Sequence, residues 1–116
     1  MSSIARTNVG KRLSDMAVHN GVAYLAGQVA EDPSQDITGQ TTQILNTIDQ
    51  LLASAGTDKT RLLMVQIFVA NMKEFDGMNK AWDAWVPAGS APPRATIEAR
   101  LASADYKVEI VVTAAV

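Results

Sequence analysis

The stretch Met16-Ala17-Val18-His19-Asn20-Gly21-Val22-Ala23-Tyr24-Leu25-Ala26 decides how the fold begins. Strand-forming residues flank Asn20-Gly21, a dipeptide suited to a two-residue type I′ turn because both of its positions accept positive φ. The stretch therefore predicts a β-hairpin. Upstream, Ile4–Asn8 has the composition of a short strand. Downstream, Gly27–Ala30 leads into Glu31-Asp32-Pro33-Ser34, whose turn-forming residues predict a loop.

The next segments predict a helix, a strand and a second helix. From Gln40 to Ala55 apolar residues recur at helical spacing, and Gly56 is a natural C-terminal stop. Arg61–Ala70 is short, almost entirely apolar and β-branched at several points, which predicts a strand buried on both faces. Glu74–Trp85 predicts an amphipathic helix, because its apolar residues are spaced i, i+3, i+7 and i+10. These residues are Phe75, Met78, Trp82 and Trp85.

Two segments at the C-terminal end predict a closing hairpin. Pro87–Pro93 reads as a loop, and Arg94–Leu101 and Lys107–Val116 read as strands joined through Ala102–Asp105. The element order is then β-β-β-α-β-α-β-β. With two helices segregated onto one face of a mixed sheet, it is an α+β sandwich, a single domain over residues 1–116. No third helix remains for the other face, so we expect an oligomer to cover it.

Composition excludes several classes of function. The 116 residues include no cysteine and a single histidine, His19, which leaves no thiol chemistry and no multi-histidine metal site. A net charge of −2 disfavours nucleic-acid binding through a broad basic face. No apolar run approaches the roughly 18 residues of a membrane span, and the N-terminus lacks the apolar stretch of a secretory signal. We therefore expect a cytoplasmic protein with no membrane segment, no metal and no cofactor.

Two charged residues interrupt apolar strands and are the candidates for chemistry. Arg94 follows two prolines, whose rigid backbone fixes the direction of its side chain; the alternative is a surface salt bridge. Glu109 lies in an apolar strand, where a buried unpaired carboxylate is costly; the alternative is a solvent-facing position. In the expected hairpin Arg94 lies opposite roughly residue 114, about 16 Å along the sheet from Glu109. A site that uses both residues therefore requires an interface between subunits.

The order and spacing of several short motifs resemble the RidA (YjgF/YER057c/UK114) family over nearly the whole chain. The step from Arg94 to Glu109 fits the family's arginine-to-glutamate spacing. The motifs are Asn20-Gly21 through Tyr24-Leu25-Ala26-Gly27-Gln28, Asp32-Pro33, Gln40 through Ile48, Ala55-Gly56, Val65 through Val69, Phe75, Met78-Asn79, Pro93-Arg94-Ala95-Thr96 and Val108-Glu109-Ile110.

This resemblance implies a chorismate-mutase-like fold, a homotrimer and a hydrolase. The implied reaction is the deamination of 2-enamine and 2-imine acids such as 2-aminoacrylate to 2-keto acids and ammonia, without a cofactor. Arg94 would bind the carboxylate of the small-molecule substrate through its planar fork, and Glu109 would position or activate the attacking water, in clefts between subunits. The same clefts would be lined by Ser14, Ala26, Gly27, Asn79, Ala95 and Thr96.

The sequence departs from the family pattern at two site positions. Leu13-Ser14 stand where many deaminases of the family have a tyrosine, and Thr96 stands at a frequent cysteine. The first change alters the shape and polarity of the pocket, and with them the preferred substrate or the level of activity. Two alternatives stay open. One is a non-catalytic trimer that binds a small ligand or a partner, and the other is a ribonuclease, which the acidic balance and the lone His19 disfavour.

Overall fold

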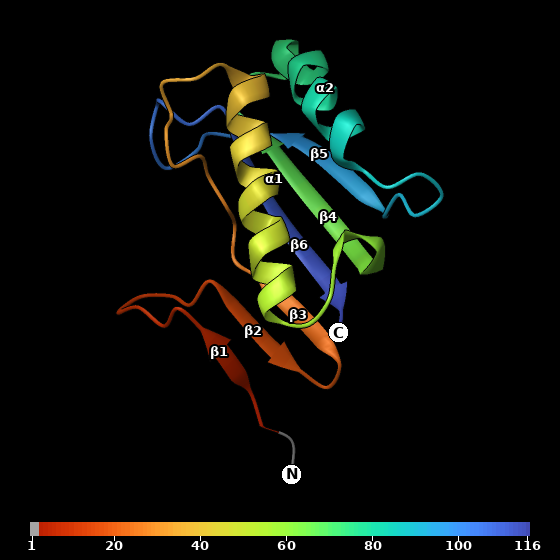
Figure 1. The fold of residues 1–116 in the computed structure, drawn as a ribbon. Coiled ribbons are helices and arrows are strands. Elements are labelled where there is room, and N and C mark those ends of the chain that lie inside the picture. The colour runs from red at the N-terminus through yellow and green to blue at the C-terminus, as the bar shows by residue number, and fades with distance from the viewer. Residues whose placement is uncertain (1–2) are drawn as a thin grey trace.

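Six strands form one mixed sheet, and both α-helices lie against the same face of it (Figure 1). The computed structural model describes residues 3–116. Met1 and Ser2 lie outside the described residues, and they belong to the N-terminal stretch in which no secretory signal is expected. The elements are β1 (Ala5–Thr7), β2 (Met16–His19), β3 (Val22–Leu25), α1 (Ile37–Ser54), β4 (Leu62–Val69), α2 (Phe75–Trp85), β5 (Arg94–Glu98) and β6 (Val108–Ala115), with two short 3₁₀ helices, η1 (Lys59–Arg61) and η2 (Met72–Glu74). The predicted α+β order is confirmed.

The N-terminal hairpin forms as the sequence predicts. Met16 pairs with Leu25. Asn20 and Gly21 have φ values of 50° and 78°, the positive values that a type I′ turn needs. Helix α1 begins at Ile37, earlier than the predicted Gln40, because the Asp36 carboxylate accepts a hydrogen bond from the backbone N–H of Gly39 and caps the helix.

The predicted closing hairpin is wrong, because β4 lies between β5 and β6. The strand order is β1-β2-β3-β6-β4-β5. Val65 of β4 pairs with Arg94 of β5 on one side and with Val112 of β6 on the other. Strands β4 and β5 run parallel, since the connection through α2 returns the chain to the end from which β4 started. The connection 99–107 then crosses the end of β4 to reach β6.

Strand β4 is buried on one face only, which corrects the prediction of burial on both. Val65, Ile67 and Val69 are buried against the helices, whereas Met64 and Gln66 are exposed on the opposite face. This helix-free face also carries Tyr24 and Ile97, which are 53% and 46% exposed. Within residues 3–116 both α-helices lie on the other side, and neither is long and apolar enough to cross a membrane. The sheet therefore presents an apolar face that this chain leaves open.

Candidate functional site

Arg94 opens β5 and lies on the helix-covered side of the sheet, where α2 supplies its partners. Phe75, Asn79 and Trp82 follow one another at i, i+4 and i+7, which places all three on one side of α2. Arg94 Nη1 donates a hydrogen bond to Asn79 Oδ1 at 2.7 Å. The guanidinium carbon Cζ lies 5.8 Å from the ring centroid of Phe75 and 5.2 Å from that of Trp82. Arg94 thus sits among neutral partners instead of in a surface salt bridge.

Glu109 lies on the helix-free face. Its neighbours along β6, Val108 and Ile110, are buried against the helices, and Glu109 itself is half-buried opposite Phe68. Its carboxylate lies over Gly27, where a Cβ would clash with Glu109 Oε2. Gln28 and Ile110 exchange backbone hydrogen bonds of 2.9 and 3.1 Å, which fix this corner. Glycine at position 27 is therefore what allows the glutamate to lie against the backbone.

The same corner brings Ser14 and Ala26 close to Gly27. The backbone N–H of Ala26 donates to the carbonyl of Asp15 at 2.8 Å, which ties the end of β3 to the connection between β1 and β2. Ser14, directly before Asp15, is half-buried. Asp15 also accepts a hydrogen bond from Asn8 Nδ2 at 2.8 Å, which closes that connection on itself.

Thr96 and Ala95 point to different faces of β5. Thr96 pairs with buried Ile67 and shares the helix-covered face with Arg94. Its Oγ1 is buried and has no hydrogen-bond partner within residues 3–116, an arrangement that costs about 1–3 kcal/mol. Ala95 pairs with exposed Gln66 on the helix-free face.

Apart from Ala95, which belongs to neither, the predicted site residues form two groups within one chain. We call them the arginine half-site (Arg94, Asn79, Thr96) and the glutamate half-site (Glu109, Gly27, Ala26, Ser14). Arg94 of β5 is aligned with Val65 of β4 and, through it, with Val112 of β6. Glu109 therefore lies two strands away from Arg94 and three residues along β6. At about 4.8 Å per strand and 3.3 Å per residue, their Cα atoms are about 14 Å apart, with side chains on opposite faces. The predicted separation of roughly 16 Å assumed the wrong strand pairing.

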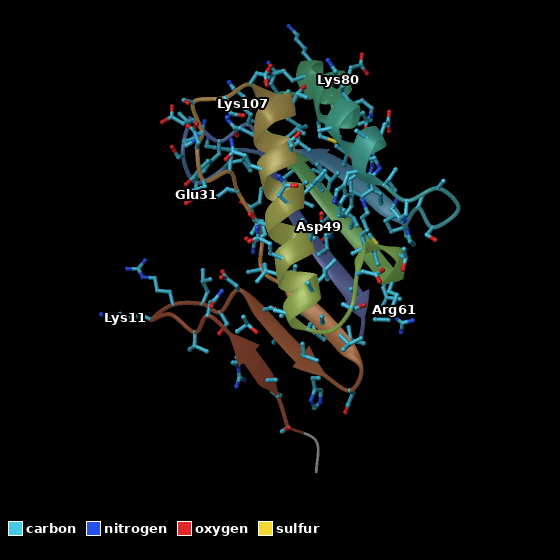
Figure 2. All side chains as sticks on the ribbon, in the orientation of Figure 1. Lys11, Glu31, Asp49, Arg61, Lys80 and Lys107 are labelled. Carbon is cyan, nitrogen blue, oxygen red and sulfur yellow. The ribbon has the colours of Figure 1, made fainter. Side chains whose placement is uncertain are left out.

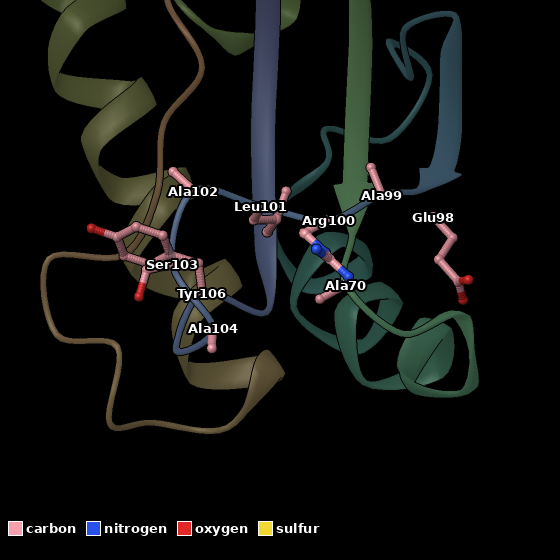
Figure 3. A pocket seen from close by; sticks show the side chains of 9 residues that line it. All are labelled: Ala70, Glu98, Ala99, Arg100, Leu101, Ala102, Ser103, Ala104 and Tyr106. Carbon is pink, nitrogen blue, oxygen red and sulfur yellow. The ribbon is translucent and has the colours of Figure 1, made fainter.

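A cavity of about 820 Å³ lies beyond the end of the sheet, against the connection between β5 and β6 (Figure 3). It contains neither Arg94 nor Glu109. One of its lining residues, Glu98, accepts a hydrogen bond from the backbone N–H of Met72 at 2.8 Å. A cleft shared between two copies has only one wall in a single chain, so a closed cavity is not expected at either half-site.

The charged side chains of the described residues offer no cluster of metal ligands. No group of three or more histidine, aspartate or glutamate side chains within residues 3–116 is placed to hold a metal ion. In Figure 2, Lys11 and Arg61 lie at opposite sides of the molecule, and both lie away from Lys80 and Lys107 at its upper end. The charged groups at the two half-sites are the Arg94 guanidinium and the Glu109 carboxylate.

Known proteins resemble this chain over nearly its full length. Residues 4–116 match the family described as Endoribonuclease L-PSP. A RutC family protein of Haemophilus ducreyi is 53% identical over 113 residues, which cover 97% of each chain. The RutC family protein YoaB of Escherichia coli K12 is 44% identical over 114 residues, or 98% of this chain and 99% of its own. A solved YjgF family structure from Neisseria meningitidis has a TM-score of 0.95 at 39% identity, covering 97% of this chain and 94% of its own.

The two helices on a mixed sheet define an α+β protein of the YjgF type. The chain belongs to the Endoribonuclease L-PSP family, also known as YjgF/RidA, as its motifs indicated. Family and fold are thereby established. The reaction is a further step that depends on the two half-sites.

Proposed function

We propose that this chain hydrolyses 2-enamine and 2-imine acids of the 2-aminoacrylate type to 2-keto acids and ammonia. The observation that carries the proposal is the pair of half-sites. One holds a guanidinium that can bind the carboxylate of a substrate, and the other holds a carboxylate that can position a water molecule. Family membership supports the same reading. Arginine matches a carboxylate better than lysine does, because its planar fork donates two parallel hydrogen bonds.

The proposed reaction needs only water and the two half-sites. The enamine moves a proton from nitrogen to its β-carbon and becomes the imine. The oxygen of water then bonds to the imine carbon, while Glu109 accepts a proton from that water and returns it to the nitrogen. The hydroxyl proton of this tetrahedral intermediate then passes through Glu109 to the nitrogen, the carbon–nitrogen bond breaks as the carbonyl forms, and ammonia and the 2-keto acid leave. Arg94 holds the carboxylate throughout, so binding and orientation supply much of the rate enhancement.

A homotrimer is part of this proposal. Arg94 and Glu109 lie on opposite faces of one sheet, so one small substrate meets both only if a second copy supplies one of them. The helix-free face offers the contact surface, since Tyr24, Met64 and Ile97 leave apolar area open to water. A closed ring of three copies repeats the same contact three times. We also propose a cytoplasmic location, which the absence of cysteine permits.

The test is ammonia release from 2-aminoacrylate made in situ from serine by a dehydratase. We expect the wild-type chain to exceed the spontaneous rate, and Arg94→Ala and Arg94→Lys to lose most of that excess, since an ammonium cannot reproduce the fork. Circular dichroism of each variant checks that the fold is kept. An Arg94→Ala protein with full activity would overturn the assignment. Carboxylate binding without any rate enhancement in the wild type would favour a non-catalytic ligand-binding trimer.

A further inference from the structure

We propose that Trp82 is a positioning residue for Arg94, holding the guanidinium plane so that its Nε–Nη2 edge is presented to the ligand. The inference rests on the proposed role of Arg94 in binding a carboxylate. It adds a residue whose spacing in the sequence predicted only core packing. Trp82 is 6% exposed, and its ring faces the Arg94 Cζ at 5.2 Å.

Three contacts from α2 restrict the guanidinium in different ways. Asn79 accepts a hydrogen bond from Nη1 and thereby anchors one end of the group. The rings of Phe75 and Trp82 lie within about 6 Å of Cζ, the range in which the negative face of an aromatic ring attracts a cation. Nη1 is engaged by Asn79, and within residues 3–116 no acceptor bonds Nε–H or Nη2–H, so these two donors form the open side of the fork. This side suits bidentate binding of a carboxylate.

Helix α2 is itself fixed near both of its ends, so its side chains are a rigid frame for Arg94. Near the start, Thr38 Oγ1 donates to the carbonyl of Gly77 at 2.7 Å. At the end, Lys59 Nζ donates to the backbone carbonyl of Trp85 at 2.6 Å, a bond that does not depend on the side chain at position 85. Arg94, on a separate element, is therefore placed against a helix that α1 and η1 hold still.

Trp85 provides a matched control on the same helix. It is 9% exposed, close to the 6% of Trp82, and the two ring centroids lie 5.4 Å apart. Its cationic neighbour is Lys59, at 5.1 Å from the ring centroid, and not Arg94. Replacing either tryptophan with leucine removes a similar amount of buried aromatic surface, and at Trp85 it also removes the hydrogen bond from Nε1 to Asp49 Oδ2, so Trp85→Leu is the more demanding control for the fold. Only the replacement at Trp82 removes an aromatic ring that contacts the Arg94 guanidinium.

The first measurement is the NMR signal of the Arg94 Nε–Hε group, assigned by its loss in Arg94→Lys. Ring currents of Trp82 should move Hε upfield in the wild type. We expect Trp82→Leu to return it toward the position of a free arginine and Trp85→Leu to leave it in place. Trp82→Phe, which restores an aromatic face, should recover part of the shift. An unchanged Hε signal in both Trp82 variants would overturn the proposal.

The second measurement is function. For 2-aminoacrylate hydrolysis we expect Trp82→Leu to raise KM by about 2- to 30-fold, the range of a cation–π contact, with a smaller change in kcat. Titration with pyruvate, the product, should show the same loss of affinity, and Trp85→Leu should show neither. Equal KM values in the two leucine variants would contradict the positioning role. A wild-type chain that shows the Hε shift but no turnover would refute the proposed function and leave the placement of Arg94 by Trp82 intact.

Discussion

Two inactive variants should restore each other's activity when their subunits are mixed. Arg94→Ala removes the arginine half-site from every chain, and Glu109→Ala removes the glutamate half-site. The two residues are about 14 Å apart on opposite faces of one sheet, so the proposed cleft would take them from different copies. In an equal mixture, half of the chains still carry Arg94 and the other half still carry Glu109. About a quarter of the clefts are then complete.

The assay compares ammonia release from 2-aminoacrylate for three samples at equal total protein. Each variant is denatured and refolded alone, and the third sample is an equal mixture that is denatured and refolded together. We expect about a quarter of wild-type activity in the mixture and background activity in each variant alone. Native mass spectrometry, with one variant isotope-labelled, confirms that mixed trimers have formed. Mixed trimers without recovered activity would show that one chain supplies both residues, or that Glu109 takes no part.

Three further predictions concern the glutamate half-site and the stability of the fold. Gly27→Ala should lower activity while circular dichroism stays unchanged, because the added Cβ displaces the Glu109 carboxylate. Gln40→Leu should lower the free energy of unfolding in urea by about 2–4 kcal/mol, since this fully buried amide bonds the backbone of two loops and would leave those groups unpaired. The Asp58 pKa lies below its ordinary value because Thr60 donates to the carboxylate. Asp58 therefore stabilises the fold above its ordinary pKa and loses this effect as pH falls through the lowered value, and Thr60→Val should raise that pKa in an NMR titration.

The elements were predictable from local sequence, whereas one strand pairing was not. Asn20-Gly21 and the apolar spacing of α1 and α2 act over a few residues, so the hairpin and helices could be predicted. The position of β4 between β5 and β6 depends on contacts between distant segments. A signal was nevertheless present, because a strand followed by a helix and another strand favours a parallel crossover. The connection 99–107 is also long for a hairpin turn.

The charged residues of the candidate site could be chosen from the sequence, whereas their surroundings could not. Arg94 and Glu109 stand out because burying a charged side chain in an apolar strand is costly unless the charge has a partner. The contact of Trp82 with Arg94 was missed, since its helical spacing fits a core residue equally well. The need for glycine at position 27 arises from the Glu109 carboxylate, which is 82 positions away in the sequence (109 − 27). Such a close approach becomes visible only once β3 and β6 are seen side by side.

The helix-free face sets a condition on the newly made chain. In the homotrimer proposed above, a monomer that has folded but not yet met a partner would expose Tyr24, Met64 and Ile97 to water. With association at about 10⁶ per molar per second, chains at about 1 µM need about a second to meet, and at nanomolar levels about a quarter of an hour. During that interval the face is open to chaperones, proteases and wrong partners. Low expression would therefore reduce the yield of assembled protein more than in proportion, and synthesis of neighbouring copies on one messenger RNA would favour assembly.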